Sequence, residues 1–549
     1  MMILKHIRFS FLIVVFMPIM GYQQTKSDPN PPNILFVISD DQSFAHTSFS
    51  GSTFVNTPAF DRVAKEGVYF SNCIAASPGC APSRGSIVTG RYPWQNEQSG
   101  QHASSWLKKY YSIIDELELN GYSIGRTGKG VDPFQYAIGD NDTLRRLTNA
   151  AGKSHSKITY DKESLTSLNG YTSRISKTDY FENFKYFMNN KRKGKPFFFW
   201  FGAHEPHRAY EKGSWRKLGK TLDDVQVPDF LPDTEEVRGD LLDYAVEIEW
   251  FDQHLERIIA YLERIGELDN TIIIVTSDNG KPFPRAKANS YEYGIHVPLA
   301  IRYPKEFSPG RIIEEPMSLI DLAPTILEVT DIKTQKMMPI SGESLLEALR
   351  SKDKAYLEGK ETYVFSGRER HSSSRYNNLG YPQRSIRSKD YLYIWNMHPE
   401  RWPAGAPQKL DPKDTLKLLP LNGIGADGNY MGQSAYTDID DSPTKTFMLE
   451  NYRDQDIKPF LDLAVNKRPE FELYAIKTDP SCMENLAGRP EFTVVEASLR
   501  KELIRALKRT ADPRVVGPNK EIFESYKRYS PIRKFPKPNP SDAEIITLD

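Results

Sequence analysis

The sequence predicts an α/β protein built on an open, mostly parallel sheet, and three apolar segments carry that prediction. Residues 33–39, 196–201 and 271–277 are short, largely apolar runs, which are typical of parallel strands buried on both faces. Polar residues follow each run directly, and open α/β sheets bind their ligands at these carboxyl ends of the strands. We expect helices between the strands to cover both faces of the sheet.

The other elements are predicted from periodicity and composition. A helical pattern covers about residues 243–265, and another helix is expected near residues 317–327. Further along, short strand candidates occur at 362–366 and 391–396, and residues 411–440 are rich in Pro, Gly, Asp and Asn, which predicts a long loop.

Beyond about residue 350 the sequence becomes polar and then contains short strand candidates, which predicts a domain boundary near residue 355. With 549 residues, the chain is long enough for two domains. We therefore predict a larger domain at 31–355 and a smaller one at 356–530. Residues 531–549 begin with a Pro-rich basic stretch and are predicted to form an extended tail.

Charge composition excludes two classes of partner. Lys plus Arg and Asp plus Glu number 72 each, so neither a nucleic-acid footprint nor a polybasic membrane surface is expected. Any anionic ligand must then be held by local charge.

The N-terminus has the pattern of a signal peptide, which we place at residues 1–22. Lys5 and Arg8 precede an apolar run at 9–20, too short for a membrane span, and no cysteine follows it to carry a lipid. We expect export to the periplasm or the medium without a stable membrane anchor.

Three cysteines imply no disulfide framework, and whether Cys73 and Cys482 form a disulfide stays open.

Acidic residues end two of the predicted strands. Asp40 and Asp41 follow the first strand, and Asp278 and Asn279 follow the run at 271–277. Either pair alone is typical of a solvated turn, but side chains that converge at one sheet edge would repel unless a hard cation lay between them. Oxygen ligands without His favour Ca²⁺, or less readily Mg²⁺, over zinc.

Residues 80–91 read Cys-Ala-Pro-Ser-Arg-Gly-Ser-Ile-Val-Thr-Gly-Arg and resemble the signature of the sulfatase family. In that family a separate maturation enzyme oxidises the cysteine to formylglycine, an aldehyde whose hydrate attacks sulfur. The resemblance implies that Cys80 becomes the nucleophile, that Arg84 holds it, and that Asp40, Asp41, Asp278, Asn279 and modified Cys80 surround one Ca²⁺. A lone cysteine is otherwise most often a small buried residue in a turn.

Three further motifs resemble elements of the same family. Residues 125–129 match its "G-K-x-H" element and make Lys129 a ligand of the nucleophile and sulfate, but Val131 stands where the family usually has histidine. His102 is one candidate to replace that imidazole. Residues 203–208 match "H-x-P-H", which implies that His204 binds sulfate and acts as general acid.

Lys287 matches a family lysine that contacts sulfate and precedes a "Y-E-x-G-x-x-x-P" segment, here residues 291–298. Lys281 and Arg285 lie in the same loop and compete for this assignment. In the mechanism that the resemblance implies, Asp278 takes a proton from the nucleophile. Lys129, Lys287 and the cation then neutralise the sulfuryl oxygens, and a covalent sulfate ester breaks down to release sulfate.

The resemblance covers most of residues 33–487, including a late segment at 472–487 similar to a C-terminal hairpin of the family. It implies an alkaline-phosphatase-like α/β/α sandwich with a smaller C-terminal α+β domain and an antiparallel sheet. Residues 277–284 and 381–387 resemble the N-sulfoglucosamine sulfohydrolase branch, whose bacterial members include polysaccharide sulfatases. The expected substrate is therefore a sulfated carbohydrate such as ulvan, heparan or fucoidan, with O- or N-sulfate left open.

Several basic residues are candidates for binding that carbohydrate, although each is also common in surface ion pairs or as a buried, paired side chain: His102, His207, Arg208, His296, Arg370, His371 and Arg384. Two rival functions remain. A phosphonate or phosphate ester hydrolase would use the same scaffold, because tetrahedral anions differ little in shape. An inactive carbohydrate-binding protein would show an eroded signature, whereas only position 131 departs here.

Overall fold

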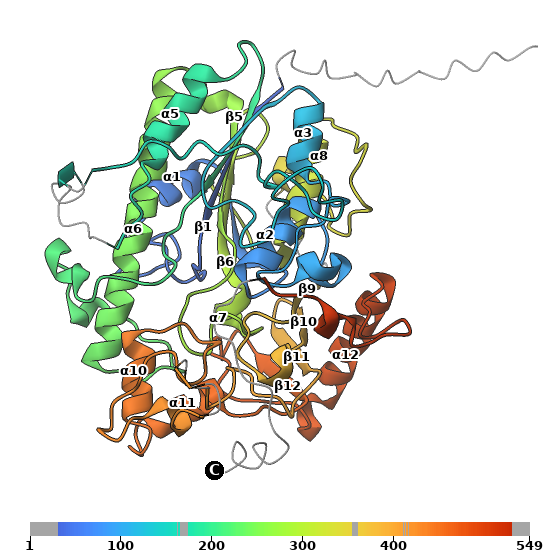
Figure 1. The fold of residues 1–549 in the computed structure, drawn as a ribbon. Helices are drawn as coiled ribbons and strands as arrows, with labels where there is room; N and C mark the ends of the chain where they lie inside the picture. Colours follow the sequence, from blue (N-terminus) through green and yellow to red (C-terminus); the bar gives the residue numbers. More distant parts are fainter. Residues whose placement is uncertain are drawn as a thin grey trace, which may run out of the picture. The chain divides into compact units, whose positions relative to one another are not determined.

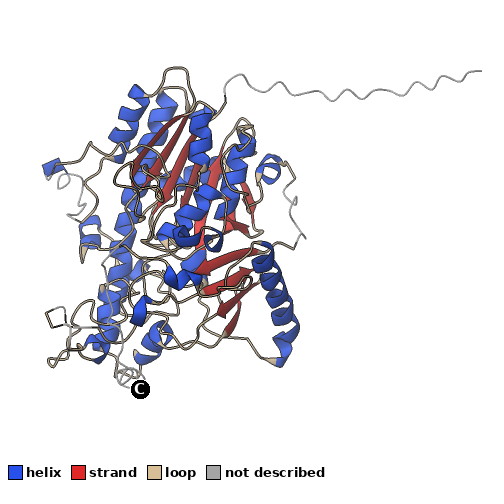
Figure 2. Cartoon of the chain, turned by 45° about the vertical axis from the view of Figure 1, so that its right-hand side comes forward, coloured by secondary structure: helices blue, strands red, loops and turns tan. Residues whose placement is uncertain are grey.

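The computed structural model describes most of the chain, namely residues 31–161, 163–164, 174–353, 361–409, 411, 413–414 and 417–529. The predicted signal peptide, the predicted tail at 531–549 and the predicted boundary near residue 355 lie outside these residues. The described chain contains a large sheet between helices and a second, smaller sheet (Figures 1 and 2).

The large sheet is mixed but mostly parallel, as predicted. Its described strands run in the order β3 (Ser123–Gly128), β4 (Phe197–Gly202), β1 (Asn33–Ser39), β5 (Thr271–Ser277), β6 (His296–Arg302), β2 (Val68–Ile74) and β7 (Arg311–Ile313), and β8 (Met317–Ser318) also pairs with β2. β6 alone among them runs antiparallel to its neighbours. The β3, β4, β1 and β5 strands are parallel, so their carboxyl ends meet at one edge.

Burial on both faces explains why β1 is a continuous apolar run. Ile34, Phe36 and Ile38 join the core on one face, whereas Leu35 and Val37 join the core on the other. Helices α2 (Cys80–Thr89), α3 (Ile113–Leu119) and α8 (Leu322–Val329) cover the first face, and α1 (Pro58–Glu66), α5 (Tyr180–Asn190) and α6 (Glu235–Arg264) cover the second (Figure 1). The predicted α/β/α layering is confirmed.

Two predicted helices have different bounds in the structure. α6 begins at Glu235 rather than near 243, because Thr234 caps it by accepting a hydrogen bond from the Val237 N–H at 3.4 Å. The segment at 317–327 starts as β8 and a 3₁₀ turn (Leu319–Asp321) before α8 begins. Asp321 accepts a hydrogen bond from the Ser318 N–H at 2.9 Å and so stabilises that turn.

The second sheet is antiparallel, with the order β12 (Phe471–Ala475), β11 (Tyr391–Asn396), β10 (Gln383–Arg387) and β9 (Val364–Arg368). α12 (Thr493–Arg509) packs on β10 and β11. Within the segment at 472–487, the chain turns after β12, where the Thr478 N–H bonds to the Ala475 carbonyl, and then returns to this strand, where the Leu486 N–H bonds to the Leu473 carbonyl at 2.8 Å.

The small sheet is tied to the large one within a single compact unit that starts at Pro32. Gly367 in β9 donates its N–H to the carbonyl of Ala76, just beyond β2, at 2.9 Å. The other α-helices with described bounds are short: α7 (Glu292–Ile295), α9 (Leu346–Arg350), α10 (Pro443–Glu450), α11 (Lys458–Val465) and α13 (Ile522–Ser525). In the part of the chain that is described, no helix is both long enough and apolar enough to cross a bilayer.

Candidate active site

Four adjacent parallel strands deliver polar side chains to the same edge of the large sheet. Lys129 follows β3 directly, and His204 lies two residues beyond β4. Asp40 and Asp278 follow β1 and β5, whose last residues are paired in register. Gly202 permits the close approach of the first two strands, because a Cβ there would lie 1.9 Å from the Lys129 carbonyl oxygen.

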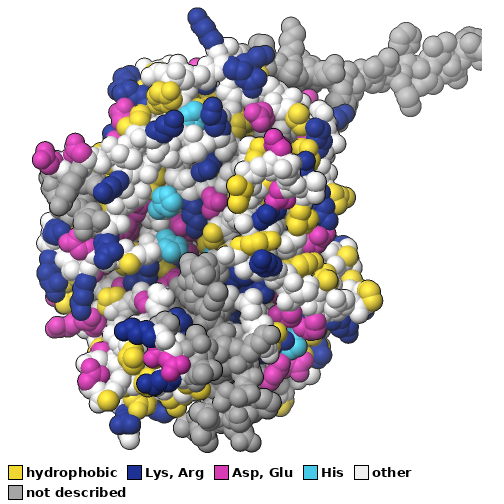
Figure 3. Space-filling view, viewed as in Figure 1, with side chains coloured by type: hydrophobic (Ala, Val, Ile, Leu, Met, Phe, Trp, Pro, Cys, Tyr) yellow, Lys and Arg dark blue, Asp and Glu magenta, His cyan; other side chains and the backbone are white. Residues whose placement is uncertain are grey.

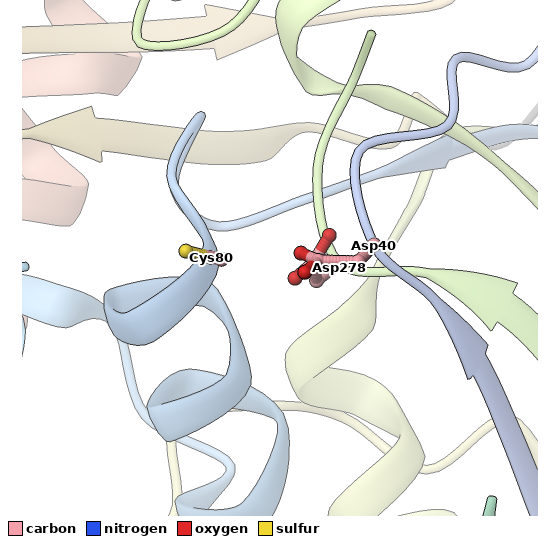
Figure 4. A group of neighbouring side chains, drawn as sticks. All are labelled: Asp40, Cys80 and Asp278. Carbon is pink, nitrogen blue, oxygen red and sulfur yellow. The ribbon is translucent and has the colours of Figure 1, made fainter. Parts of the chain in front are cut away.

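Cys80 approaches this edge from the first residue of α2. The Cys80 sulfur and one carboxylate oxygen each from Asp40 and Asp278 all lie within 4.8 Å of one another (Figure 4). All three side chains are buried. Burial raises the pKa of the Cys80 thiol to about 11, although Lys129 and Lys287 act in the opposite direction.

Arg84, one turn along α2, is fully buried and ties the cluster together. Its Nε donates to Asp278 Oδ2 at 2.6 Å, and its terminal nitrogens donate to the carbonyls of Gly130 at 3.1 Å and Ser39 at 3.3 Å. A second carboxylate, that of Asp40, lies 3.7 Å from its NH2 group. Such directed donors fix both the helix and the two carboxylates.

Two lysines neutralise the other carboxylates. Lys129 Nζ donates to both Asp40 oxygens at 2.8 and 2.6 Å. Lys287 Nζ bonds to Asp41 Oδ2 at 2.5 Å and lies 3.2 Å from Asp440 Oδ2. Three carboxylates that end strands are thus matched by Arg84 and the two lysines.

Asn279 provides an observation that fits a bound cation. Its Nδ2 donates to Asp41 Oδ1 at 2.8 Å, whereas its Oδ1 is buried without a hydrogen-bond partner. A buried amide oxygen among carboxylates is a natural ligand for a hard divalent ion. Asp41 adopts a positive φ of 75°, which aims its backbone N–H at Asp278 Oδ1, 3.0 Å away. The oxygen-rich donor set fits Ca²⁺ or Mg²⁺.

The three carboxyl groups have different proton affinities. Burial raises the pKa of Asp41 and of Asp278 to about 6, against the opposing charges of Lys287 and Arg84. Burial also opposes ionisation of Asp40, but Lys129 and the other nearby cations hold its pKa well below the usual range. Asp40 is therefore the permanently ionised member, and the other two are proton acceptors near neutrality.

His204 is the exposed member of the site. Its backbone N–H donates to the Tyr180 hydroxyl at 3.0 Å, which fixes the turn after β4. The protein around the ring, together with Lys129 and Arg84, lowers the pKa of His204 to about 4, while Asp40 acts in the opposite direction. Figure 3 shows histidine side chains reaching the surface among acidic and basic residues on one face.

The structure distinguishes the three basic residues of the loop after β5. Lys287 reaches the carboxylates as described above. Lys281 Nζ is fully buried without a hydrogen bond among the rings of Phe230, Phe283 and Tyr293. Arg285 donates to the Cys482 carbonyl and, at 3.0 Å, to the Leu463 carbonyl. Only Lys287 among these three contacts the cluster.

Three of the predicted substrate residues lie beside the cluster. His207 Nε2 is 3.8 Å from Asp41 Oδ2. His371 lies against Gly79, because a Cβ on that glycine would be 3.2 Å from the His371 ring. The His102 ring centre is 4.8 Å from that of His371.

The other four candidates have internal partners. Arg208 forms two bonds to Asp240, Arg384 bonds to Asp512 and Glu369, and His296 bonds to Glu292 and to the Ser71 carbonyl. Arg370 donates to Gln101 and to backbone carbonyls of Asn378 and Tyr526. Their assignment to substrate stays a prediction.

Asp438 and Asp440, which lie in the predicted loop at 411–440, were not predicted as site residues. Asp440 contacts Lys287, and Asp438 accepts hydrogen bonds from His371, Arg368 and Arg375. Nothing in the local sequence indicates these distant partners.

Val131, at the position of the missing histidine, is buried in the hydrophobic core. The three cysteines are free and buried, so Cys73 and Cys482 are not paired.

Comparison with solved structures confirms the fold. One similar structure, a protein in complex with its substrate D-glucosamine-2-N,6-O-disulfate, has a TM-score of 0.59 at 20% identity and covers 88% of this chain and 99% of the other. A phosphonate monoester hydrolase of Agrobacterium radiobacter has a TM-score of 0.58 at 16% identity, covering 88% and 96% of the two chains. At these identities the likeness concerns the fold alone.

Sequence comparison is more specific. An ulvan-active sulfatase of Formosa agariphila is 26% identical over 504 residues, covering 88% of this chain and 76% of the relative. The N-sulphoglucosamine sulphohydrolase of Homo sapiens is 26% identical over 530 residues, covering 90% and 93%. The family model "N-sulphoglucosamine sulphohydrolase, C-terminal" matches residues 286–413. The model "Sulfatase" matches residues 32–332, more than half of the chain, which therefore belongs to the sulfatase family of sulfuric ester hydrolases.

Proposed function

We propose that this sulfatase removes sulfate groups, as O-sulfate esters or N-sulfates, from a sulfated polysaccharide or its oligosaccharides. The observation that carries the proposal is the convergence of Cys80, Asp40 and Asp278 within 4.8 Å, with Arg84 and two lysines around them. The substrate class is supported by relatives named for activity on ulvan and for N-sulphoglucosamine.

Two groups complete the proposed site. Formylglycine made from Cys80 by a maturation enzyme would supply, as its hydrate, a nucleophilic hydroxyl for attack on sulfur. A Ca²⁺ ion held by Asp40, Asp41, Asp278, Asn279 and residue 80 would supply positive charge at that centre. The unpartnered Oδ1 of Asn279 supports the cation.

The side chains of the protein have separate roles in this proposal. Asp278 accepts the proton of the attacking hydroxyl. Arg84 fixes the position of Asp278 relative to the first turn of α2, because its Nε donates a hydrogen bond to that carboxylate. A cation bound to Asp40 and Asp41 would release Lys129 and Lys287 from these carboxylates, and both ammonium groups would then neutralise the sulfuryl oxygens.

His204 protonates the leaving oxygen or nitrogen. Its pKa is about 4 in the absence of substrate, and a bound sulfate group adds a negative charge that favours the protonated ring. Its exposed side chain suits a group that meets the departing sugar.

The decisive experiment combines mass spectrometry with a sulfate-release screen. The tryptic peptide of residue 80, from protein made in its native host, should carry an aldehyde rather than a thiol. The same protein should release sulfate from at least one of ulvan, heparan, fucoidan and carrageenan oligosaccharides, and an aryl phosphonate serves as the control substrate. A thiol at residue 80 in fully active protein would contradict the nucleophile, and hydrolysis of the phosphonate alone would contradict the substrate class.

We also propose that the mature protein is exported to the periplasm or medium. Lys5, Arg8 and the apolar run at 9–20 support this location. N-terminal sequencing of protein recovered from the periplasm or medium should begin after about residue 22 if the segment is cleaved. Recovery of the intact N-terminus from the cytoplasm would contradict export.

A further inference from the structure

A small cavity beside the first turn of α2 is bordered by three side chains with unsatisfied nitrogen atoms. The cavity has a volume of about 10 Å³ and is lined in part by Gly79, Pro82, Arg368, Arg370 and His371. His371 Nε2 and the Nε atoms of Arg368 and Arg370 are buried without hydrogen-bond partners. These side chains are 6%, 3% and 1% exposed. These three side chains line one cavity, and buried polar atoms without a protein partner are the groups that a bound water satisfies.

The tautomer of His371 follows from its other nitrogen. Nδ1 lies 3.0 Å from Asp438 Oδ1. Burial opposes ionisation of Asp438, but Arg375 and Arg368 hold its pKa well below the usual range, so it is a carboxylate. Nδ1 therefore carries the hydrogen and donates it, and Nε2 presents a lone pair.

One water molecule has enough donors and acceptors to satisfy these three groups. A cavity of roughly 10–15 Å³ is the minimum for a water, which needs two to four polar partners. The water would accept hydrogen bonds from the Nε–H groups of Arg368 and Arg370 and donate one hydrogen to His371 Nε2. Its second hydrogen remains available for one more acceptor.

The position of the cavity suggests that acceptor. Gly79 and Pro82 line it, and residue 80 lies between them in the chain at the head of α2. A Cβ on Gly79 would lie 3.9 Å from His371 Nε2, so the absence of a side chain there brings the imidazole close to the nucleophile turn. Val131 is fully buried in the core and supplies no polar group at this turn.

We propose that one ordered water occupies this cavity and connects His371 to the side chain of residue 80, so that His371 and the water together orient the nucleophile in place of the imidazole missing at Val131. This inference rests on the proposed function, because orientation matters only if residue 80 is the nucleophile. His371 is then a positioning residue supplied by the segment after β9, and Asp438 holds its tautomer.

The water itself is tested without activity. A high-resolution crystal structure of the full-length wild-type protein should show density for one water within hydrogen-bond distance of His371 Nε2 and of both arginine Nε atoms. An empty cavity, or one filled by a side chain, overturns the inference and leaves the sulfatase assignment intact.

Kinetics tests the orienting role on the converted wild-type enzyme and three variants. His371→Ala should lower kcat by about 10- to 100-fold and change KM by less than about twofold, as loss of an orienting partner does. His371→Gln, which keeps an acceptor near Nε2, should recover most of kcat. His398→Ala is the matched control, since His398 pairs with Glu400 and Glu521 near the surface, and it should behave as wild type.

An unchanged kcat in His371→Ala, or an equal loss in His371→Gln, overturns the orienting role. If wild-type protein releases sulfate from no substrate, the proposed function fails instead. The crystallographic result separates these two failures.

Discussion

Replacing Arg84 by methionine tests the charge balance of the site. Methionine keeps much of the length of the side chain but removes the donors to Asp278, at 2.6 Å, and to two backbone carbonyls. It also leaves the carboxylates of Asp40, Asp41 and Asp278 with one cation fewer in a fully buried setting. Removing one partner of a buried ion pair costs about 3–5 kcal/mol. We expect Arg84→Met to lose this much stability in chelator.

A divalent cation should offset part of that loss, because the proposed cation site lies among the same carboxylates. A ligand at about 100 times its Kd adds about 2.7 kcal/mol to the free energy of unfolding. Stability rather than activity is the right measurement, since Arg84 also belongs to the segment that the proposed maturation enzyme would read. Urea unfolding of unconverted protein, followed by tryptophan fluorescence with chelator and with Ca²⁺, gives both values.

Arg62→Met is the control for that experiment. Arg62 is 36% exposed and pairs with Glu66 and Glu263, so its removal should cost no more than about 1 kcal/mol. If Arg84→Met unfolds at the same urea concentration as wild type in chelator, the cluster does not need Arg84 for neutrality. The reasoning about the cation site would then be refuted.

Four further outcomes follow from the site. Cys80→Ala should abolish sulfate release while changing the free energy of unfolding by no more than about 1 kcal/mol, and wild-type turnover would contradict the mechanism. Calcium affinity, measured by calorimetry, should fall from about pH 7.5 to about pH 5, because Asp41 and Asp278, whose pKa values are raised to about 6, must lose their protons to bind metal. A pH-independent affinity would exclude them as ligands. Asp440→Asn removes a charge that positions Lys287, so KM for the sulfated substrate should rise. An unchanged KM would show that Asp440 does not position Lys287 for substrate binding. Thiol titration of unfolded mature protein should find at most two thiols from its three cysteines, and three would mean that Cys80 is unmodified.

Strand ends were the most predictable part of the fold. The bounds of β1 and β5 match the predicted runs because each strand is buried on both faces and ends abruptly at acidic residues. α6 was predicted to start about eight residues too late. Its first two turns contain charged residues and Gly239 among the buried apolar residues Val237 and Leu241, which hides the apolar periodicity, whereas the cap at Thr234 sets the real beginning.

Partners distant in sequence could not be predicted. Asp440 meets Lys287, and Asp438 meets His371, because the loop that carries both aspartates packs Tyr436 and Ile439 into one hydrophobic cluster with Phe283 of the loop after β5. Arg384 and His296 were predicted to bind substrate, but each has a partner inside the protein. A sequence shows a basic residue near a motif, but not whether a buried carboxylate such as Asp512 or Glu292 already pairs with it.

Every residue of α2 is buried, and this has a consequence for the order of events during synthesis. An enzyme that oxidises Cys80 must enclose the surrounding peptide in its own active site, which the closed helix forbids. We therefore expect modification to precede the folding of the large sheet around residues 80–89. Folded protein with an unmodified cysteine should keep its thiol when it is incubated with the maturation system, whereas a synthetic peptide of the same segment should be converted. Conversion of the folded protein would show that α2 opens readily.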